Sequence, residues 1–90
     1  MNIEELYNRI EGRVKNKNKN SYTYRLIKFG PKKIAQKFGE ESTELIVDFL
    51  NGTKKRTVEE AADVIYHLLV LLKSKKITLK EVYKELSRRK

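Results

Sequence analysis

Cysteine and tryptophan are absent from this chain of 90 residues, proline occurs once, and there is no long apolar segment. Without cysteine the chain can form neither a disulfide nor a thiolate zinc site, and catalysis by a thiol is excluded. The longest uninterrupted apolar run, Leu68 to Leu72, is far shorter than the roughly 20 residues that a membrane-spanning helix needs. The N-terminal residues also lack the basic start and apolar run of a signal peptide. We therefore expect a cytoplasmic protein that makes no membrane contact.

The small size of the chain limits the hydrophobic core that it can form. Residues 1–90 correspond to one domain. A domain of this size buries only a little over half of the surface of its unfolded chain, so its core is marginal. Disulfides and thiolate metal sites cannot add to that core here. Oligomerisation is the remaining common route, and because the homodimer is the most frequent form we expect one.

The charge of the chain is one-sided, with 21 Lys and Arg against 12 Asp and Glu and a formal net charge of +9. Such a balance is typical of proteins with an anionic partner, which can be a nucleic acid, a membrane surface or a phosphorylated small molecule. It is equally compatible with solvated, lysine-rich helix faces. The acids, however, are concentrated beside apolar residues, and the bases surround them. A set of solvated helix faces does not account for this contrast.

Apolar residues recur at helical spacing along the chain and predict an all-α fold of four to five helices, with no strand pattern. A polar Lys-Asn repeat over residues 15–20 predicts a flexible loop. Capping signals mark several helix ends: Ser21, the Gly30-Pro31 pair, Asn51-Gly52, and the capping box of Thr78 and Glu81. The expected helices are residues 2–15, a short segment after Ser21, 31–50, 54–75 and a last segment after Thr78. We expect them to form a helical bundle that homodimerisation completes.

Acidic residues interrupt the apolar face of the helix expected at 31–50. Its apolar stripe runs through Phe38 and Leu45, and the position that should continue it between them is Glu41. Glu44 lies one turn further along the same edge, Lys37 lies one turn earlier, and Glu40 reaches this edge at i, i+4 from Glu44. A contradiction between an apolar pattern and an acid tends to mark a functional site.

The helix expected at 54–75 carries a second acidic group in an apolar setting. It is apolar nearly all round from Ala61 to Leu72, which predicts burial on most sides. Glu60, Asp63 and His67 share one line at i, i+3 and i+7, and a buried Asp63 needs a cation or a hydrogen-bond network. We interpret His67 as a hydrogen-bonded core histidine in preference to a ligand. Glu60 has an alternative role, because Thr57 and Glu60 have the spacing of a capping box.

The two acidic groups together predict a divalent cation site. Two unit charges about 4 Å apart repel by about 4 kcal/mol at an effective dielectric constant of about 20. A fold that brings these carboxylates together therefore needs a counter-charge. A hard cation with oxygen ligands suits them, and Mg²⁺ with a phosphate substrate fits best. The chain has no glycine-rich phosphate loop, zinc-finger spacing or helix-turn-helix signal that indicates another function.

Two segments of the sequence resemble a known family. They are Lys-x-Gly-Glu-Glu-x-x-Glu at residues 37–44 and Glu-Ala-Ala-Asp-x-x-Tyr-His at residues 60–67, preceded by Ser-Tyr-Thr at 21–23. The chain is similar over nearly its whole length to phosphoribosyl-ATP pyrophosphohydrolases of histidine biosynthesis. The wider superfamily of all-α nucleotide pyrophosphohydrolases, which includes MazG-type enzymes, shares the Glu-Glu-x-x-Glu and Glu-x-x-Asp patterns.

The resemblance implies hydrolysis of phosphoribosyl-ATP to phosphoribosyl-AMP and pyrophosphate, with Mg²⁺ as cofactor. It also implies a homodimer, and a phosphoribosyl-AMP cyclohydrolase that we expect on a separate chain. Metal binding would fall to Glu41, Glu44, Glu60 and Asp63, and catalysis to Glu40, Glu41 and Lys37. Glu40 would be a further ligand, a support for one, or the base for the attacking water. The expected contacts to substrate phosphates are Lys37, Lys33, Arg25 and Lys55.

Two other functions are compatible with parts of the sequence. A housecleaning pyrophosphatase for another nucleoside triphosphate would use the same acids, although the Tyr66-His67 context and Ser21-Tyr22-Thr23 favour phosphoribosyl-ATP. A basic helical dimer that binds nucleic acid would explain the lysines. It gives no reason for acids on apolar stripes, so we do not expect nucleic acid as a partner.

Overall fold

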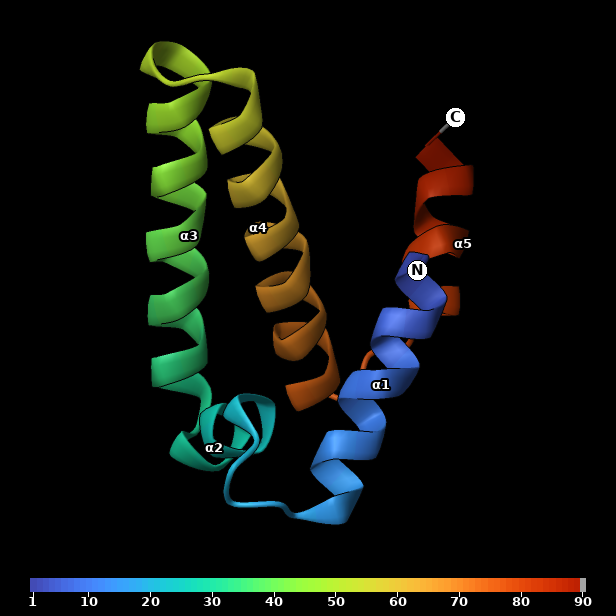
Figure 1. Ribbon diagram of the computed structural model, residues 1–90. Helices are drawn as coiled ribbons and strands as arrows, with labels where there is room; N and C mark the ends of the chain where they lie inside the picture. The colour runs from blue at the N-terminus through green and yellow to red at the C-terminus, as the bar shows by residue number, and fades with distance from the viewer. Residues whose placement is uncertain (90) are drawn as a thin grey trace.

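The computed structural model describes residues 1–89, in which five α-helices and no strands are present (Figure 1). α3 and α4 form a long antiparallel hairpin, α2 lies across its open end, and α1 leans against α4. α5 runs beside α1 and away from α3, and a hydrogen bond from Tyr83 to Glu4 joins α5 to α1. The helices are α1 Ile3–Asn16, α2 Tyr22–Phe29, α3 Pro31–Asn51, α4 Lys54–Ser74 and α5 Leu79–Arg89.

The helices begin and end close to the predicted residues. Ser21 caps α2 by accepting a hydrogen bond from the Tyr24 backbone N–H at 3.2 Å. Gly30 adopts φ 102°, a conformation that favours glycine, and Pro31 then starts α3. The predicted capping box of Thr78 and Glu81 is confirmed at the start of α5. The loop predicted for residues 15–20 begins slightly later, because α1 continues to Asn16.

The hydrophobic core lies at the end of the hairpin where α1 and α2 pack. At the edge of this core, the Tyr7 hydroxyl donates a hydrogen bond to the Ile77 carbonyl at 2.7 Å. All four of the helices α1–α4 contribute buried apolar side chains, which are Tyr7, Ile10, Leu26, Ile34, Leu69 and Val70. This small core fixes α2 against the hairpin and so places the residues of α2 beside the middle of α4.

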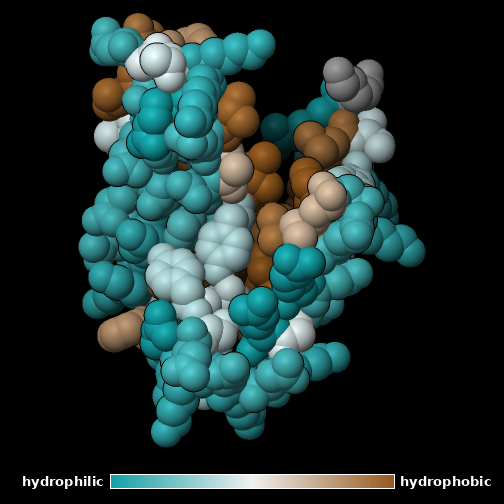
Figure 2. Space-filling model, viewed as in Figure 1, coloured by the Kyte–Doolittle hydropathy of each residue, from teal (hydrophilic) through white to brown (hydrophobic). Residues whose placement is uncertain are grey.

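Much of the rest of the apolar surface is uncovered in the single chain. Within the single chain α4 is not buried on most sides as expected, because Ala62, Ile65 and Leu68 are exposed. Figure 2 shows apolar side chains along the groove between the hairpin and α1, where Ile3, Leu6, Ala62 and Ile65 help to line a hollow of about 370 Å³. At the far end of the hairpin, further apolar side chains are exposed: Ile46, Val47, Phe49, Leu50 and Val58. No helix within residues 1–89 has the length and apolar character needed to cross a membrane.

Candidate functional site

Acidic side chains from α3 and α4 meet halfway along the hairpin. The carboxylate oxygens of Glu41, Glu60 and Asp63 include one from each residue that lie within 4.8 Å of one another. Within the described part of the chain this is the single group of three or more such side chains with the spacing of a metal site. The two helices of the hairpin therefore bring together residues that are separated by nineteen or more positions in the sequence. The predicted meeting of the two acidic groups is confirmed for these three residues.

Glu60 is the most buried acid of this group, with 5 % of the residue exposed. Its Oε1 atom accepts a hydrogen bond from Arg56 Nη2 at 2.8 Å, one helical turn earlier on α4. Its Oε2 atom is buried and has no hydrogen-bond partner. A buried carboxylate oxygen without a partner is costly and rare in folded proteins. This atom therefore indicates a bound group at the cluster.

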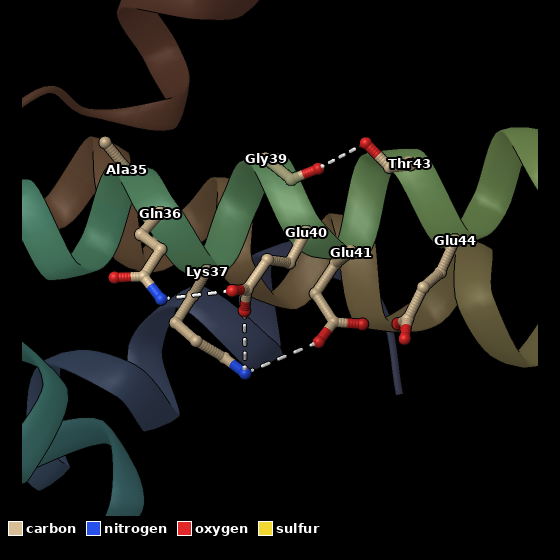
Figure 3. A pocket seen from close by; sticks show the side chains of 8 residues that line it. All are labelled: Ala35, Gln36, Lys37, Gly39, Glu40, Glu41, Thr43 and Glu44. Carbon is tan, nitrogen blue, oxygen red and sulfur yellow. Dashed lines mark hydrogen bonds and ion pairs between the residues drawn. The ribbon is translucent and has the colours of Figure 1, made fainter.

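Glu41 lies on the opposite wall of the cluster, and its side chain is 13 % exposed. Burial raises the pKa of its carboxyl group, and the neighbouring Glu44 and Asp63 raise it further. Figure 3 shows Glu44 next to Glu41 on the same side of α3, although Glu44 itself is exposed. The pKa of Glu60 is also raised by burial, and then by Glu44, against the opposing effect of Arg56. The acids thus repel one another, which a cation would relieve.

Lys37 and Glu40 form the edge of the cluster on α3. Lys37 Nζ lies 3.5 Å from Glu40 Oε1 and 3.8 Å from Glu41 Oε1 (Figure 3). The pKa of Glu40 is lowered by a hydrogen bond from Gln36 and by Lys37. The pKa of Lys37 is raised by nearby Tyr22 and, to a smaller extent, by Glu40 and Glu41. This edge borders an open hollow of about 610 Å³ along α3, which leaves Glu40 accessible to solvent.

Asp63 departs from the prediction, because it is exposed and not buried. Its carboxylate still belongs to the cluster, and its backbone carbonyl accepts a hydrogen bond from His67 Nδ1 at 2.8 Å. The sequence pattern placed Asp63 among apolar neighbours, but those neighbours, such as Ala62, are themselves exposed.

The prediction for His67 is confirmed, since it is a buried and hydrogen-bonded histidine outside the acidic cluster. Its Nε2 atom lies 3.1 Å from the Tyr22 hydroxyl on α2. The alternative capping role of Glu60 is wrong. α4 begins one turn before Thr57, with Thr53 as its cap, and the Thr57 hydroxyl donates instead to the carbonyls of Thr53 and Asp48.

The structure separates the four cations predicted to contact phosphate. Lys37 lies in the cluster, and Lys33 is close enough to contribute to the lowered pKa of Glu40. Lys55 is exposed in the first turn of α4 and forms no ion pair within residues 1–89. Arg25 donates a hydrogen bond to the Lys19 carbonyl at 3.0 Å and so binds the loop before α2. Arg25 is not part of the acidic cluster.

Arg56 is not among the residues that the sequence predicted for the site, yet it lies beside the acidic cluster. It pairs with Glu60 and lies 3.7 Å from Asp48 Oδ2 on α3, so it links the two helices of the hairpin beside the cluster. The available signal was its i, i+4 spacing to Glu60, which places the two side chains on one helix face.

The sequence of the chain is similar to those of known pyrophosphatases. The phosphoribosyl-ATP pyrophosphatase of Sulfolobus acidocaldarius is 51% identical over 87 residues, which cover 97% of this chain and 92% of the relative. That of Pyrobaculum islandicum is 48% identical, with 97% and 93% covered. The histidine biosynthesis bifunctional protein HisIE of Caldanaerobacter subterraneus subsp. tengcongensis is 47% identical, and the match covers 97% of this chain and 42% of that longer protein.

The match to a family is equally extensive. Residues 3–90 match the family described as phosphoribosyl-ATP pyrophosphohydrolase. This range includes both acidic segments and the Ser-Tyr-Thr segment on which the resemblance was based. The chain belongs to the phosphoribosyl-ATP pyrophosphohydrolase family.

Proposed function

We propose that this protein hydrolyses phosphoribosyl-ATP to phosphoribosyl-AMP and pyrophosphate in a Mg²⁺-dependent reaction, the second step of histidine biosynthesis. Family membership supports the substrate and the reaction. The observation that carries the metal dependence is the buried Glu60 Oε2 atom, which has no protein partner and belongs to a residue whose carboxylate meets those of Glu41 and Asp63.

The residues of the cluster fit Mg²⁺. All of the available ligand atoms are carboxylate oxygens, and hard divalent cations prefer such ligands. Glu41, Glu60 and Asp63 would hold the ion, and Glu44 lies beside them as a further candidate. When bound, Mg²⁺ would supply positive charge to polarise phosphoryl oxygens, neutralise the pyrophosphate leaving group and lower the pKa of water. In proteins, Mg²⁺ is usually bound by one or two carboxylates together with substrate phosphates.

The remaining charged groups of the site have complementary roles in this proposal. Lys37 carries a positive charge at the edge of the cluster, where it can contact the triphosphate. Glu40 is ionised and exposed beside it, so it can accept a proton from the attacking water. Arg56 holds Glu60 through Oε1 and leaves Oε2 free for the ion. The product phosphoribosyl-AMP would be the substrate of a phosphoribosyl-AMP cyclohydrolase in the same pathway.

We further propose that the protein acts as a homodimer. The exposed apolar side chains of the hairpin continue into the groove between α4 and α1, where Ile3, Leu6 and Ile65 lie. Phe49 and Leu50 are 73% and 68% exposed, which is unusual for adjacent large apolar residues on a helix. A second copy offers the same apolar surface in return, as a two-fold interface requires. Light scattering after size-exclusion chromatography measures this state directly.

The reaction is tested by ³¹P NMR of the products formed in ¹⁸O-labelled water. We expect pyrophosphate and phosphoribosyl-AMP from phosphoribosyl-ATP, with the label identifying which phosphorus the water attacks. dUTP and dCTP serve as comparison substrates, because a housecleaning enzyme would release pyrophosphate from them. Rapid turnover of either of these nucleotides, with none of phosphoribosyl-ATP, would refute the proposed substrate.

A further inference from the structure

A second pocket is lined by Tyr22, whose hydroxyl lies 3.1 Å from Nε2 of His67. It is formed where α1, α2 and α4 meet and has a volume of about 230 Å³. Its polar lining consists of Arg9 and Arg13 from α1, Tyr22 and Thr23 from α2, and Tyr66 from α4. Sites that hold a whole small molecule usually measure about 300–1,000 Å³. This pocket therefore suits one end of a substrate.

The two arginines of this pocket are available to a ligand. Arg9 and Arg13 are spaced i, i+4 and so share one face of α1. Neither forms an ion pair within residues 1–89, whereas Arg56, Arg88 and Arg89 each pair with a glutamate. A guanidinium group binds phosphate through two parallel hydrogen bonds. Two unpaired guanidinium groups at one pocket are a suitable site for a phosphate dianion.

The hydroxyl groups of the pocket are held in place by hydrogen bonds. The Thr23 hydroxyl is bonded to the Tyr66 hydroxyl, and Thr23 itself is buried. Burial raises the pKa of Tyr66, while Thr23 and the nearby positive charge of Arg13 act in the opposite direction. Arg13 and Tyr66 both line the pocket. The pocket thus combines fixed hydroxyl groups with two unpaired cations.

His67 connects the pocket to the acidic cluster. Its Nδ1 atom donates to the Asp63 carbonyl at 2.8 Å, because a carbonyl oxygen only accepts. Its Nε2 atom lies 3.1 Å from the Tyr22 hydroxyl, which belongs to the lining of the pocket. A single imidazole ring therefore separates the backbone of a cluster residue from the pocket. A substrate with anionic groups at both ends can reach the two sites together.

We propose that Arg9 and Arg13 bind the phosphomonoester of the phosphoribosyl group, while the triphosphate occupies the acidic cluster. This inference rests on the proposed function, since it assigns one end of that substrate. The triphosphate is placed at the carboxylates because it needs the cation there. The phosphomonoester, at the far end of the molecule, needs positively charged side chains instead, and Arg9 and Arg13 supply them. The fixed hydroxyls of Thr23 and Tyr66 are the groups that face the ribose.

The test compares Arg9→Gln, Arg13→Gln and the double variant in steady-state kinetics. We expect the double variant to raise the KM for phosphoribosyl-ATP at least about tenfold, because two charge-assisted contacts are lost. ATP carries the triphosphate without the phosphoribosyl group, so its inhibition constant should stay within about twofold of that of the wild type if it uses the cluster alone. Arg88→Gln is the matched control. It removes the same charge from an exposed, Glu85-paired arginine on α5 and should leave both constants unchanged.

The outcomes of these measurements keep this inference separate from the proposed function. An unchanged KM in the double variant, or an equal loss of affinity for ATP, would overturn the subsite. If the wild type does not act on phosphoribosyl-ATP, the proposed function fails, and calorimetric titration with ribose 5-phosphate then tests the pocket alone. Binding that the double variant loses supports the pocket, and absent or equal binding refutes it. If the glutamine variants fold poorly, Arg13→Lys, which keeps the charge, replaces them. We expect its KM to lie between those of the wild type and the double variant.

Discussion

The two ends of the α3–α4 hairpin are built differently. At the end that α1 and α2 cover, Ile34, Leu69 and Val70 are at most 2% exposed. At the far end, Phe49 and Leu50 remain in contact with solvent, although they are equally apolar. The acidic cluster lies between the two ends, and within it Glu60 is buried while Asp63 is exposed.

This difference shows that a single chain covers one end of its hairpin and not the other. The short helices α1 and α2 are long enough to cover only part of the hairpin. The covered end orients the residues of α2 and α4 around His67, whereas the far end leaves apolar side chains exposed, which a second copy covers in our proposal. The acidic cluster therefore lies between a packed core and an uncovered apolar surface.

The largest effect is expected from removing charge at the boundary. Loss of a side chain that only hydrogen-bonds to a metal ligand typically lowers activity roughly 10- to 100-fold. Asp63→Asn and Glu60→Gln each remove a proposed ligand itself, so each should lower turnover by more than that. In the absence of metal the same variants should fold at least as stably, because a mutually repelling carboxylate is lost. Pyrophosphate release and thermal unfolding measure the two effects. Unchanged turnover in both variants would refute the metal assignment.

The covered and uncovered ends should respond differently to the same kind of substitution. Leu69→Ala should lower the free energy of unfolding by about 2–5 kcal/mol, because it leaves a cavity in a core that is small. Phe49→Ala should change the stability of the single chain by no more than about 0.5 kcal/mol. It should instead weaken association, which sedimentation at several concentrations detects. Equal losses of chain stability in the two variants would remove the distinction between the ends.

The cluster should also give the metal-free protein a specific dependence on pH. Burial and neighbouring acids raise the pKa of Glu41 and Glu60 above 4.5. The folded state then binds more protons than the unfolded state in the range above 4.5, so the free energy of unfolding falls as the pH rises through that range. Urea unfolding with a chelator should show this slope, and Glu60→Gln should reduce it. The lowered pKa values of Glu81 and Glu85 act below 4.5 and lie outside this window. A steeper slope in Glu60→Gln would contradict the account.

The smallest effects are expected at two glycines inside helices. A Cβ at Gly12 in α1 or at Gly39 in α3 would meet no atom within 4 Å. Alanine at either position should therefore raise the free energy of unfolding by about 0.5–1 kcal/mol. Gly52→Ala is the contrasting variant, since its Cβ would lie 2.7 Å from Asp48 Oδ1, and it should be destabilising. A stability loss in Gly39→Ala would show that this part of α3 is less open than described.

The sequence was sufficient to predict the helices, because their signals are local. The Ser21 cap, the Gly30-Pro31 boundary and the Thr78 capping box each depend on neighbouring residues, and all three are present in the structure. The meeting of Glu41 with Glu60 was also predictable. Two long amphipathic helices joined by a short turn at Gly52 must pack against each other. Glu41 interrupts the apolar stripe of the first, and Glu60 precedes the apolar segment of the second on one line with Asp63.

What the sequence could not give was the distribution of burial. Asp63 and Phe49 have apolar neighbours in the sequence. A periodic apolar pattern does not say whether a helix of the same chain packs against these residues. The pairing of Arg56 with Asp48 and the approach of Tyr22 to His67 depend on how separate helices are placed. The pocket around Arg9 and Arg13 likewise exists only once α1, α2 and α4 are assembled.

The central claim is that the carboxylate cluster of the hairpin performs a Mg²⁺-dependent cleavage of phosphoribosyl-ATP. The most direct test is the rate of pyrophosphate release as Mg²⁺ is titrated, with wild type and Glu60→Gln measured side by side. The account predicts a saturable dependence on Mg²⁺ in the wild type, almost no product without the ion, and loss of turnover in Glu60→Gln. Release that is independent of Mg²⁺, or undiminished in Glu60→Gln, would contradict it.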